Sequence, residues 1–176
     1  MIKEYTLTVF TENRTGVLSR VVGIITRRHI NIESVSASES SIDGIHKIVV
    51  VVKVAQDLIQ KLIGQLDKQV DVLKSFYYDN DEIVYQEIAL YKIPSEQFYN
   101  GDVVERLVRE HGARILRIEQ EYVVIEKTGY PDEIVALLNE FKRIGIYEFI
   151  RSGRVAIVKQ MERLNTYLKT IKAQAN

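Results

Sequence analysis

The sequence predicts an α+β fold made of two tandem βαββαβ domains. The order of strand-like and helix-like hydrophobic patterns occurs twice, at a period of roughly 78 residues. Of the 176 residues, 46% are hydrophobic, which is enough for two small cores, and only 2 are proline, which argues against disorder. We expect a first domain at 1–79, a linker at 80–82, a second domain at 83–158 and an amphipathic C-terminal helix at 159–176.

The first copy of the pattern begins with a strand in which Tyr5, Leu7 and Val9 alternate with threonines. A break at 11–16 leads into a helix with one apolar face. The remaining expected elements are strands at 32–40 and 45–54, a helix around 58–66 and a strand at 70–78. The unbroken apolar run Ile48–Val52 predicts burial on both faces, or a face that a partner covers.

The second copy repeats this order but has a different first turn. Its elements are expected as a strand at 83–93, a helix from 103 to near 112, a hairpin of 115–119 with 122–127, a helix from Pro131 and a strand at 144–150. Its first turn, Pro94–Asp102, is longer, more acidic and more aromatic than that of the first copy. We therefore expect the second domain to serve assembly or contact with a partner.

The apolar spacing Met161, Leu164, Leu168 and Ile171 predicts the C-terminal amphipathic helix. We expect it to pack on the second domain or on a dimer mate rather than to bind another protein.

Composition excludes several classes of protein. Lys and Arg total 24, as do Asp and Glu, so net charge gives no reason to expect a nucleic acid or an anionic membrane as partner. The same neutrality makes oligomerisation easy to accommodate. The absence of cysteine excludes disulfides, thiolate zinc sites and thiol nucleophiles. With no membrane-length apolar stretch and an N-terminus that reads as a strand, we expect a soluble, cytoplasmic protein.

The turn between the first strand and the first helix is the candidate binding site. Gly16 permits positive φ, and a helix N-terminus exposes N–H groups that favour a carboxylate or phosphate. Asn13 is able to cap this helix or to bond a ligand. Asn31 begins the adjacent strand and is expected to face the same place. From spacing alone, purely structural roles for all three residues are the favoured interpretation.

Alternative chemistries receive little support from the sequence. His29, His46 and His111 are scattered and show neither metal-ligand nor triad spacing. RNA-binding domains of the same topology carry aromatics on the third strand, and this third strand has none. An acylphosphatase-type enzyme needs an arginine cradle in the first loop. Arg14 is present there, but one arginine is weak support for such a site. The acidic residues at 79–82 are better explained as a solvated linker than as a cation loop.

A family resemblance is visible around the candidate turn. Asn13–Arg20 and Arg28–Ser34 resemble the first ACT domain of the regulatory small subunit of acetohydroxyacid synthase, also called acetolactate synthase. Val70–Leu73 and Arg151–Gly153 also resemble that family. The resemblance runs from Met1 to about Lys159, and the second domain matches mainly in layout, as a second ferredoxin-like, ACT-like domain.

The resemblance implies a non-catalytic subunit that binds and activates the catalytic subunit. Thiamine diphosphate, Mg and FAD are then expected on the catalytic subunit and no cofactor on this chain. The family also implies feedback inhibition by valine or another branched-chain amino acid, bound between paired ACT domains of a homodimer. The matched effector contacts are Asn13, Gly16 and Asn31, with backbone groups of Val17 and Leu18 close by.

Two rival readings remain open at this point. One is an ACT protein that senses an amino acid alone, for instance as a transcriptional regulator, although the sequence shows no DNA-binding motif. The other is an enzyme of ferredoxin-like topology, which would require a catalytic constellation that the sequence does not show.

Overall fold

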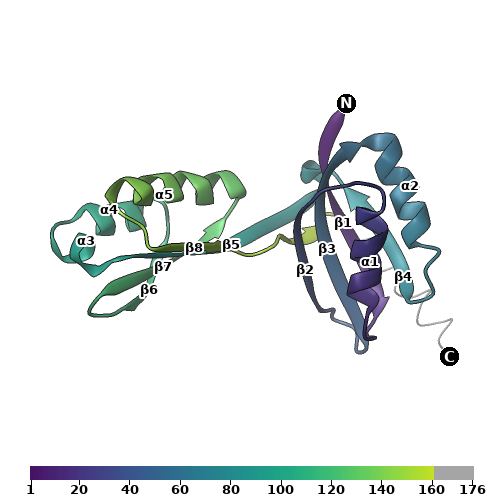
Figure 1. Cartoon of the computed structure of the whole chain (residues 1–176), viewed down its shortest axis with the longest axis horizontal. Coiled ribbons are helices and arrows are strands. Elements are labelled where there is room, and N and C mark those ends of the chain that lie inside the picture. The colour runs from purple at the N-terminus through teal and green to yellow at the C-terminus, as the bar shows by residue number, and fades with distance from the viewer. Residues whose placement is uncertain (161–176) are drawn as a thin grey trace. The chain divides into compact units, whose positions relative to one another are not determined.

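A computed structural model describes residues 1–160 of the chain, which form two compact units (Figure 1). The first unit comprises Met1–Tyr85 together with the described residues from Arg154 onward, and the second is Gln86–Gly153. The C-terminal amphipathic helix expected at 159–176 lies outside the described residues except for its first two positions. Among residues 1–160, no helix has the length and apolarity needed to cross a membrane.

The first unit is a four-stranded antiparallel sheet with two helices on one face (Figure 1). The strand order is β2-β3-β1-β4, so β2 and β4 are the edges. The strands are β1 (Ile2–Glu12), β2 (Ile32–Glu39), β3 (Ile45–Ala55) and β4 (Val72–Tyr78), and the helices are α1 (Val17–Thr26) and α2 (Gln56–Leu66). The predicted βαββαβ order is confirmed for this unit.

The run Ile48–Val52 in β3 is buried on both faces by this chain itself. Its alternate residues Ile48, Val50 and Val52 pack against the helices with the apolar residues of β1. On the opposite face, Val49 packs in a second cluster with Tyr78, Ile83 and Ala156. Of the two alternatives predicted for this run, burial on both faces is therefore confirmed, and β3 is the central apolar strand of the unit.

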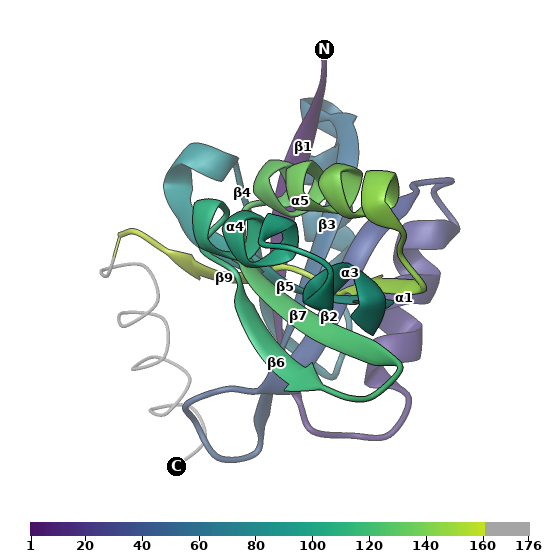
Figure 2. The same ribbon diagram turned by 90° about the vertical axis from the view of Figure 1, so that its left-hand side faces the viewer.

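The second unit repeats the βαββαβ order with sheet order β6-β7-β5-β8. Its elements are β5 (Ile83–Pro94), α3 (Ser95–Tyr99), α4 (Val103–Glu110), β6 (Arg114–Ile118), β7 (Tyr122–Gly129), α5 (Pro131–Ile144) and β8 (Glu148–Arg151). Helices α4 and α5 lie on one face of this sheet (Figure 1, Figure 2). Tyr91 and Phe141 are fully buried in its core, and the Tyr91 hydroxyl donates to the Ile134 carbonyl at 2.8 Å.

Three short elements were not expected from the sequence. The acidic, aromatic connection contains α3, and the polar break after β4 is a 3-10 turn, η1 (Asn80–Glu82), closed by a capping box with Asp79. The third is β9 (Val155–Val158), which pairs with β5. Because β9 belongs to the first unit, the compact unit 86–153 is shorter at both ends than the second domain expected at 83–158.

Candidate functional site

The turn between β1 and α1 is built around a glycine in the left-handed backbone conformation. Gly16 has φ 87° and ψ −7° and is the N-cap residue of α1. An L side chain rarely adopts this left-handed conformation, which costs a non-glycine residue about 1–2 kcal/mol. A Cβ placed on Gly16 would meet no atom within 4 Å, so the backbone angle and not lack of space requires glycine here.

No side chain caps the N-terminus of α1, and its first turn holds no acidic residue. The Asn13 side chain is exposed, while its backbone N–H donates to the Gly44 carbonyl at 3.0 Å. Asn13 is therefore not the cap of α1, which was the structural alternative for this residue. The positive end of the helix and an exposed amide lie beside the same turn, an arrangement that suits an anion.

The two residues that open α1 point to different environments. Val17 is buried in the core of the first unit, so it offers a ligand only its backbone groups. Leu18 exposes 42% of its surface beside the turn. The turn thus combines helix N–H groups and an amide with an exposed branched apolar side chain.

Charged residues around the turn form a small ion-pair network that the sequence analysis missed. The Arg20 guanidinium lies 2.6 Å from the Asp71 carboxylate, and Arg14 lies 2.7 Å from Glu12 and 3.7 Å from Asp71. Asp71 is nearly buried, and its carbonyl accepts a hydrogen bond from the Glu12 N–H at 3.1 Å. Asp71 lies 51 residues beyond Arg20 in the sequence, so spacing gave no signal for this network.

Asn31 lies at the other end of the sheet from Asn13. The register pairs Ile32 with Val52 and Val52 with Tyr5, whereas Glu12, next to Asn13, pairs with Ile45. Seven residues of extended β1 separate these two levels, which corresponds to about 24 Å. Within one chain Asn31 therefore does not face the Asn13 turn, contrary to our expectation, because β2 runs parallel to β1 and starts where β1 starts.

At its own end of the sheet, Asn31 is exposed and donates from Nδ2 to Glu33 Oε1 at 3.3 Å. The structure brings together Asn13, Gly16, Val17 and Leu18 and leaves Asn31 apart.

The histidines do not assemble a reactive centre in the described part of the chain. Among residues 1–160, no group of three or more His, Cys, Asp or Glu side chains is placed to hold a metal ion. His29 has φ 56° just beyond α1, and His111 is the C-cap of α4. His46 pairs in register with Thr11 and Glu39, and its Nε2 is buried without a hydrogen-bond partner among the described residues.

Comparison with known proteins identifies the family. A family model described as "AHAS small subunit-like ACT domain" matches residues 7–74, and one described as "Small subunit of acetolactate synthase" matches residues 86–160. The acetolactate synthase small subunit of Bacillus subtilis (strain 168) is 34% identical over 166 residues, which cover 94% of this chain and 96% of that protein. The chain belongs to the acetolactate synthase small-subunit family. The resemblance seen in the sequence is confirmed.

Further members of the acetolactate synthase small-subunit family agree in length and fold. The probable small subunit of Archaeoglobus fulgidus is 31% identical over 156 residues, covering 89% of this chain and 97% of that protein. The crystal structure of the small subunit from Thermotoga maritima superimposes with a TM-score of 0.82 at 27% identity, covering 90% of this chain and 98% of that chain. The predicted fold class, two ferredoxin-like ACT-type domains, is therefore confirmed.

Proposed function

We propose that this chain activates the catalytic subunit of acetolactate synthase and makes it sensitive to valine or another branched-chain amino acid. The observation that carries the proposal is the left-handed Gly16 turn, where the uncapped N-terminus of α1 lies beside the exposed side chains of Asn13 and Leu18. As an acetolactate synthase small subunit, the chain has the catalytic subunit as its partner.

The chemistry of the turn matches the parts of a branched-chain amino acid. The carboxylate suits the N–H groups in the first turn of α1, such as that of Leu18, because the Val17 N–H already donates to the Arg14 carbonyl at 3.3 Å. The amide oxygen of Asn13 accepts from the ammonium group. The exposed Leu18 side chain packs against the branched aliphatic group, for which burial is worth about 0.8 kcal/mol per CH2. Glu12 and Asp71 already neutralise Arg14 and Arg20, so the helix end is left for the effector carboxylate.

A second copy of this chain supplies Asn31 in our proposal. Strand β2 is an edge strand, and 40% of Val35 is exposed. Two copies of β2 can pair antiparallel about a twofold axis, an isologous contact in which each strand offers the same residues. If this pairing is centred near Val35, Asn31 of one protomer lies opposite Glu39 of the other. Glu39 is in register with Thr11 and His46, at the Asn13 end of the sheet.

Inhibition follows from linkage between the effector and the partner. An effector changes an equilibrium only to the extent that it binds the two states differently. Our hypothesis is that the amino acid bridges two protomers at the β2 edge and favours one arrangement of the dimer on the catalytic subunit. We place the cofactors of the reaction, thiamine diphosphate, Mg and FAD, on the catalytic subunit and none on this chain.

Reconstitution with the catalytic subunit tests this function. Addition of the chain should raise the rate of acetolactate formation, and valine should then lower it. Asn13→Ala and Asn31→Ala should each abolish the valine effect and leave activation intact, because neither residue lies in a core. Asn139→Ala, which removes an exposed asparagine of α5, is the matched control and should be inhibited like the wild type.

Two outcomes would contradict parts of the proposal. Unchanged inhibition curves for both asparagine variants would overturn the site assignment. Failure to bind or activate the catalytic subunit would favour the rival function, an ACT protein that senses an amino acid alone. Isothermal titration with valine, leucine and isoleucine then identifies the preferred effector in either case.

A further inference from the structure

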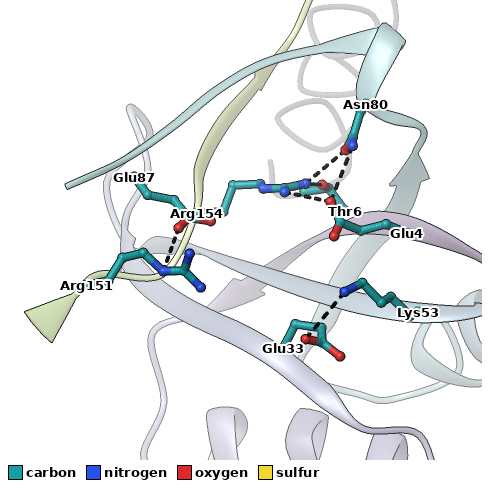
Figure 3. Close-up of polar contacts among 8 residues, drawn as sticks. All are labelled: Glu4, Thr6, Glu33, Lys53, Asn80, Glu87, Arg151 and Arg154. Carbon is teal, nitrogen blue, oxygen red and sulfur yellow. Dashed lines mark hydrogen bonds and ion pairs between the residues drawn. The ribbon is translucent and has the colours of Figure 1, made fainter. Parts of the chain in front are cut away.

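Arg154 is a buried arginine on the face of the first unit's sheet opposite the helices (Figure 3). Only 2% of the residue is exposed. One terminal nitrogen donates to Thr6 Oγ1 at 2.8 Å and to Asn80 Oδ1 at 3.0 Å, and the other donates to Glu4 Oε1 at 2.7 Å. The guanidinium also stacks on the Tyr85 ring, 3.9 Å from its centroid. The cation is thus held from β1, η1 and the start of β5.

The carboxylate of Glu4 is adapted to this cation. Burial alone would raise the pKa of Glu4, but the hydrogen bond and charge of Arg154, with help from Asn80 and Lys53, lower the pKa below its usual value. Burial of an arginine carries a desolvation cost, which the hydrogen bonds of the two terminal nitrogens and the ion pair with Glu4 offset, while Nε has no hydrogen-bond partner among the described residues. Removal of Arg154 would leave Glu4 without its main partner.

Arg154 also occupies a special place along the chain. The chain passes from the first unit to the second after Tyr85 and returns at Arg154. Tyr85 is therefore the last residue of the first unit before the chain leaves it, Arg154 is the first after the chain returns, and the two side chains stack on each other. From there the returning segment is tied to the sheet, because Ser36 of β2 donates to the Arg154 carbonyl at 2.9 Å and Lys47 of β3 donates to the Ala156 carbonyl at 2.5 Å.

Arg154 and its partners Glu4, Thr6 and Asn80 form the Arg154 anchor. A line of polar contacts joins this anchor to the effector residue Asn31. Asn31 donates to Glu33, and Glu33 lies 3.8 Å from the Lys53 ammonium. Lys53 is opposite Glu4 in the β1–β3 register, and Glu4 accepts from Arg154 (Figure 3). An effector bound between Asn31 and the Asn13 turn of a second copy would engage the Asn31 amide, which here donates to Glu33, and would so shift the balance of Lys53 between Glu33 and Glu4. The exposed links are individually weak, whereas the Arg154 end is buried and well defined.

We infer that Arg154 is a positioning residue that couples effector binding in the first unit to the state of the second unit and its catalytic partner. This inference rests on the proposed function. Arg154 touches no part of the Asn13–Gly16 turn in our assignment, so its loss should spare effector binding. Loss of Arg154 should instead reduce the coupling, by which the effector changes the affinity of the chain for the catalytic subunit and the catalytic subunit changes its affinity for the effector.

The test measures effector binding twice, with and without the catalytic subunit. For the wild type, the ratio of the two valine dissociation constants reports the coupling. Arg154→Met should bring this ratio closer to one by a factor of about 2 to 30, which is the range expected for a residue that carries coupling. Inhibition by valine should weaken in parallel. Valine binding to the free subunit should change less than about threefold. Arg154→Lys keeps the charge but not the fork geometry and should be intermediate.

The matched control is Arg151→Met, which removes the arginine three positions earlier. Arg151 pairs with Glu87 at 3.0 Å inside the second unit, so this variant loses an ion pair without touching the anchor. It should keep the wild-type ratio. Thermal unfolding of each variant confirms that it folds. If Arg154→Met does not fold, Glu4→Gln removes only the charge of the Arg154 partner and tests the same contact.

An unchanged ratio in folded Arg154→Met and Glu4→Gln proteins would overturn the inference. So would an equal loss of coupling in Arg151→Met. Failure of the wild-type chain to bind valine or to activate the catalytic subunit would instead refute the proposed function, and the wild-type measurement shows this before any variant is compared.

Discussion

Substitution of Gly16 by alanine should cost about 1–2 kcal/mol, because φ 87° is a left-handed conformation and an added Cβ meets no atom within 4 Å. This cost can lower either the stability of the free protein or its affinity for the effector. If the turn keeps its shape in the free protein, the free energy of unfolding falls by that amount. If the free turn relaxes to negative φ, stability is spared and the effector must restore the strained shape. Effector affinity then falls about 5- to 30-fold, since 1.4 kcal/mol is a factor of ten.

Denaturant unfolding and isothermal titration with valine measure the two quantities on the same sample. Their free-energy losses should sum to about 1–2 kcal/mol for Gly16→Ala. Gly23→Ala is the control: Gly23 lies inside α1, its Cβ would also meet nothing within 4 Å, and no positive φ is required there. That variant should gain about 0.5–1 kcal/mol of stability with unchanged affinity. If Gly16→Ala keeps wild-type stability and affinity, the turn does not need a left-handed backbone at this position.

Three further predictions follow from the structure. Val35→Asp should dissociate the dimer in analytical ultracentrifugation by charging the β2 edge, whereas Val135→Asp, equally exposed at 41% against 40% for Val35, should not; a dimer in both would exclude the β2 pairing. Burial raises the pKa of Tyr91 to about 12, so wild-type stability should fall as pH rises from 10.0 toward 12, while Tyr91→Phe shows no such fall in unfolding titrations. Because the pKa of Glu4 is lowered, the stability that wild type holds over Glu4→Gln is present at neutral pH and should vanish as pH falls below 4.5.

Local patterns were sufficient to predict the architecture. Alternation in β1 predicts Tyr5, Leu7 and Val9 as core residues, and all three lie in the core with residues of α1. It does not predict that the threonines between them are buried on the other face as well. The positive φ of Gly16 was also accessible, because a glycine between a strand and a helix suggests a sharp turn. The short strand β9 could not be predicted, because its four residues are too few to show the alternation of a strand.

Contacts between distant parts of the chain could not be predicted from spacing. Arg154 bonds to Thr6 across 148 residues, and Asp71 pairs with Arg20 only once β4 lies beside β1. The position of Asn31 relative to Asn13 was misjudged for a related reason. Chain order makes β2 follow the turn directly, but the helix between them carries the chain back along the sheet, so β2 starts at its far end.

Subunit complementation tests the central claim, that one effector site is built from the Asn13 turn of one protomer and Asn31 of the other. Asn13→Ala and Asn31→Ala proteins, each unable to bind valine, are mixed and allowed to exchange subunits. Each mixed dimer then regains one intact site, so titration should recover about a quarter of the wild-type binding stoichiometry at wild-type affinity. Absence of any recovered binding in mixtures shown to contain mixed dimers would contradict the shared site.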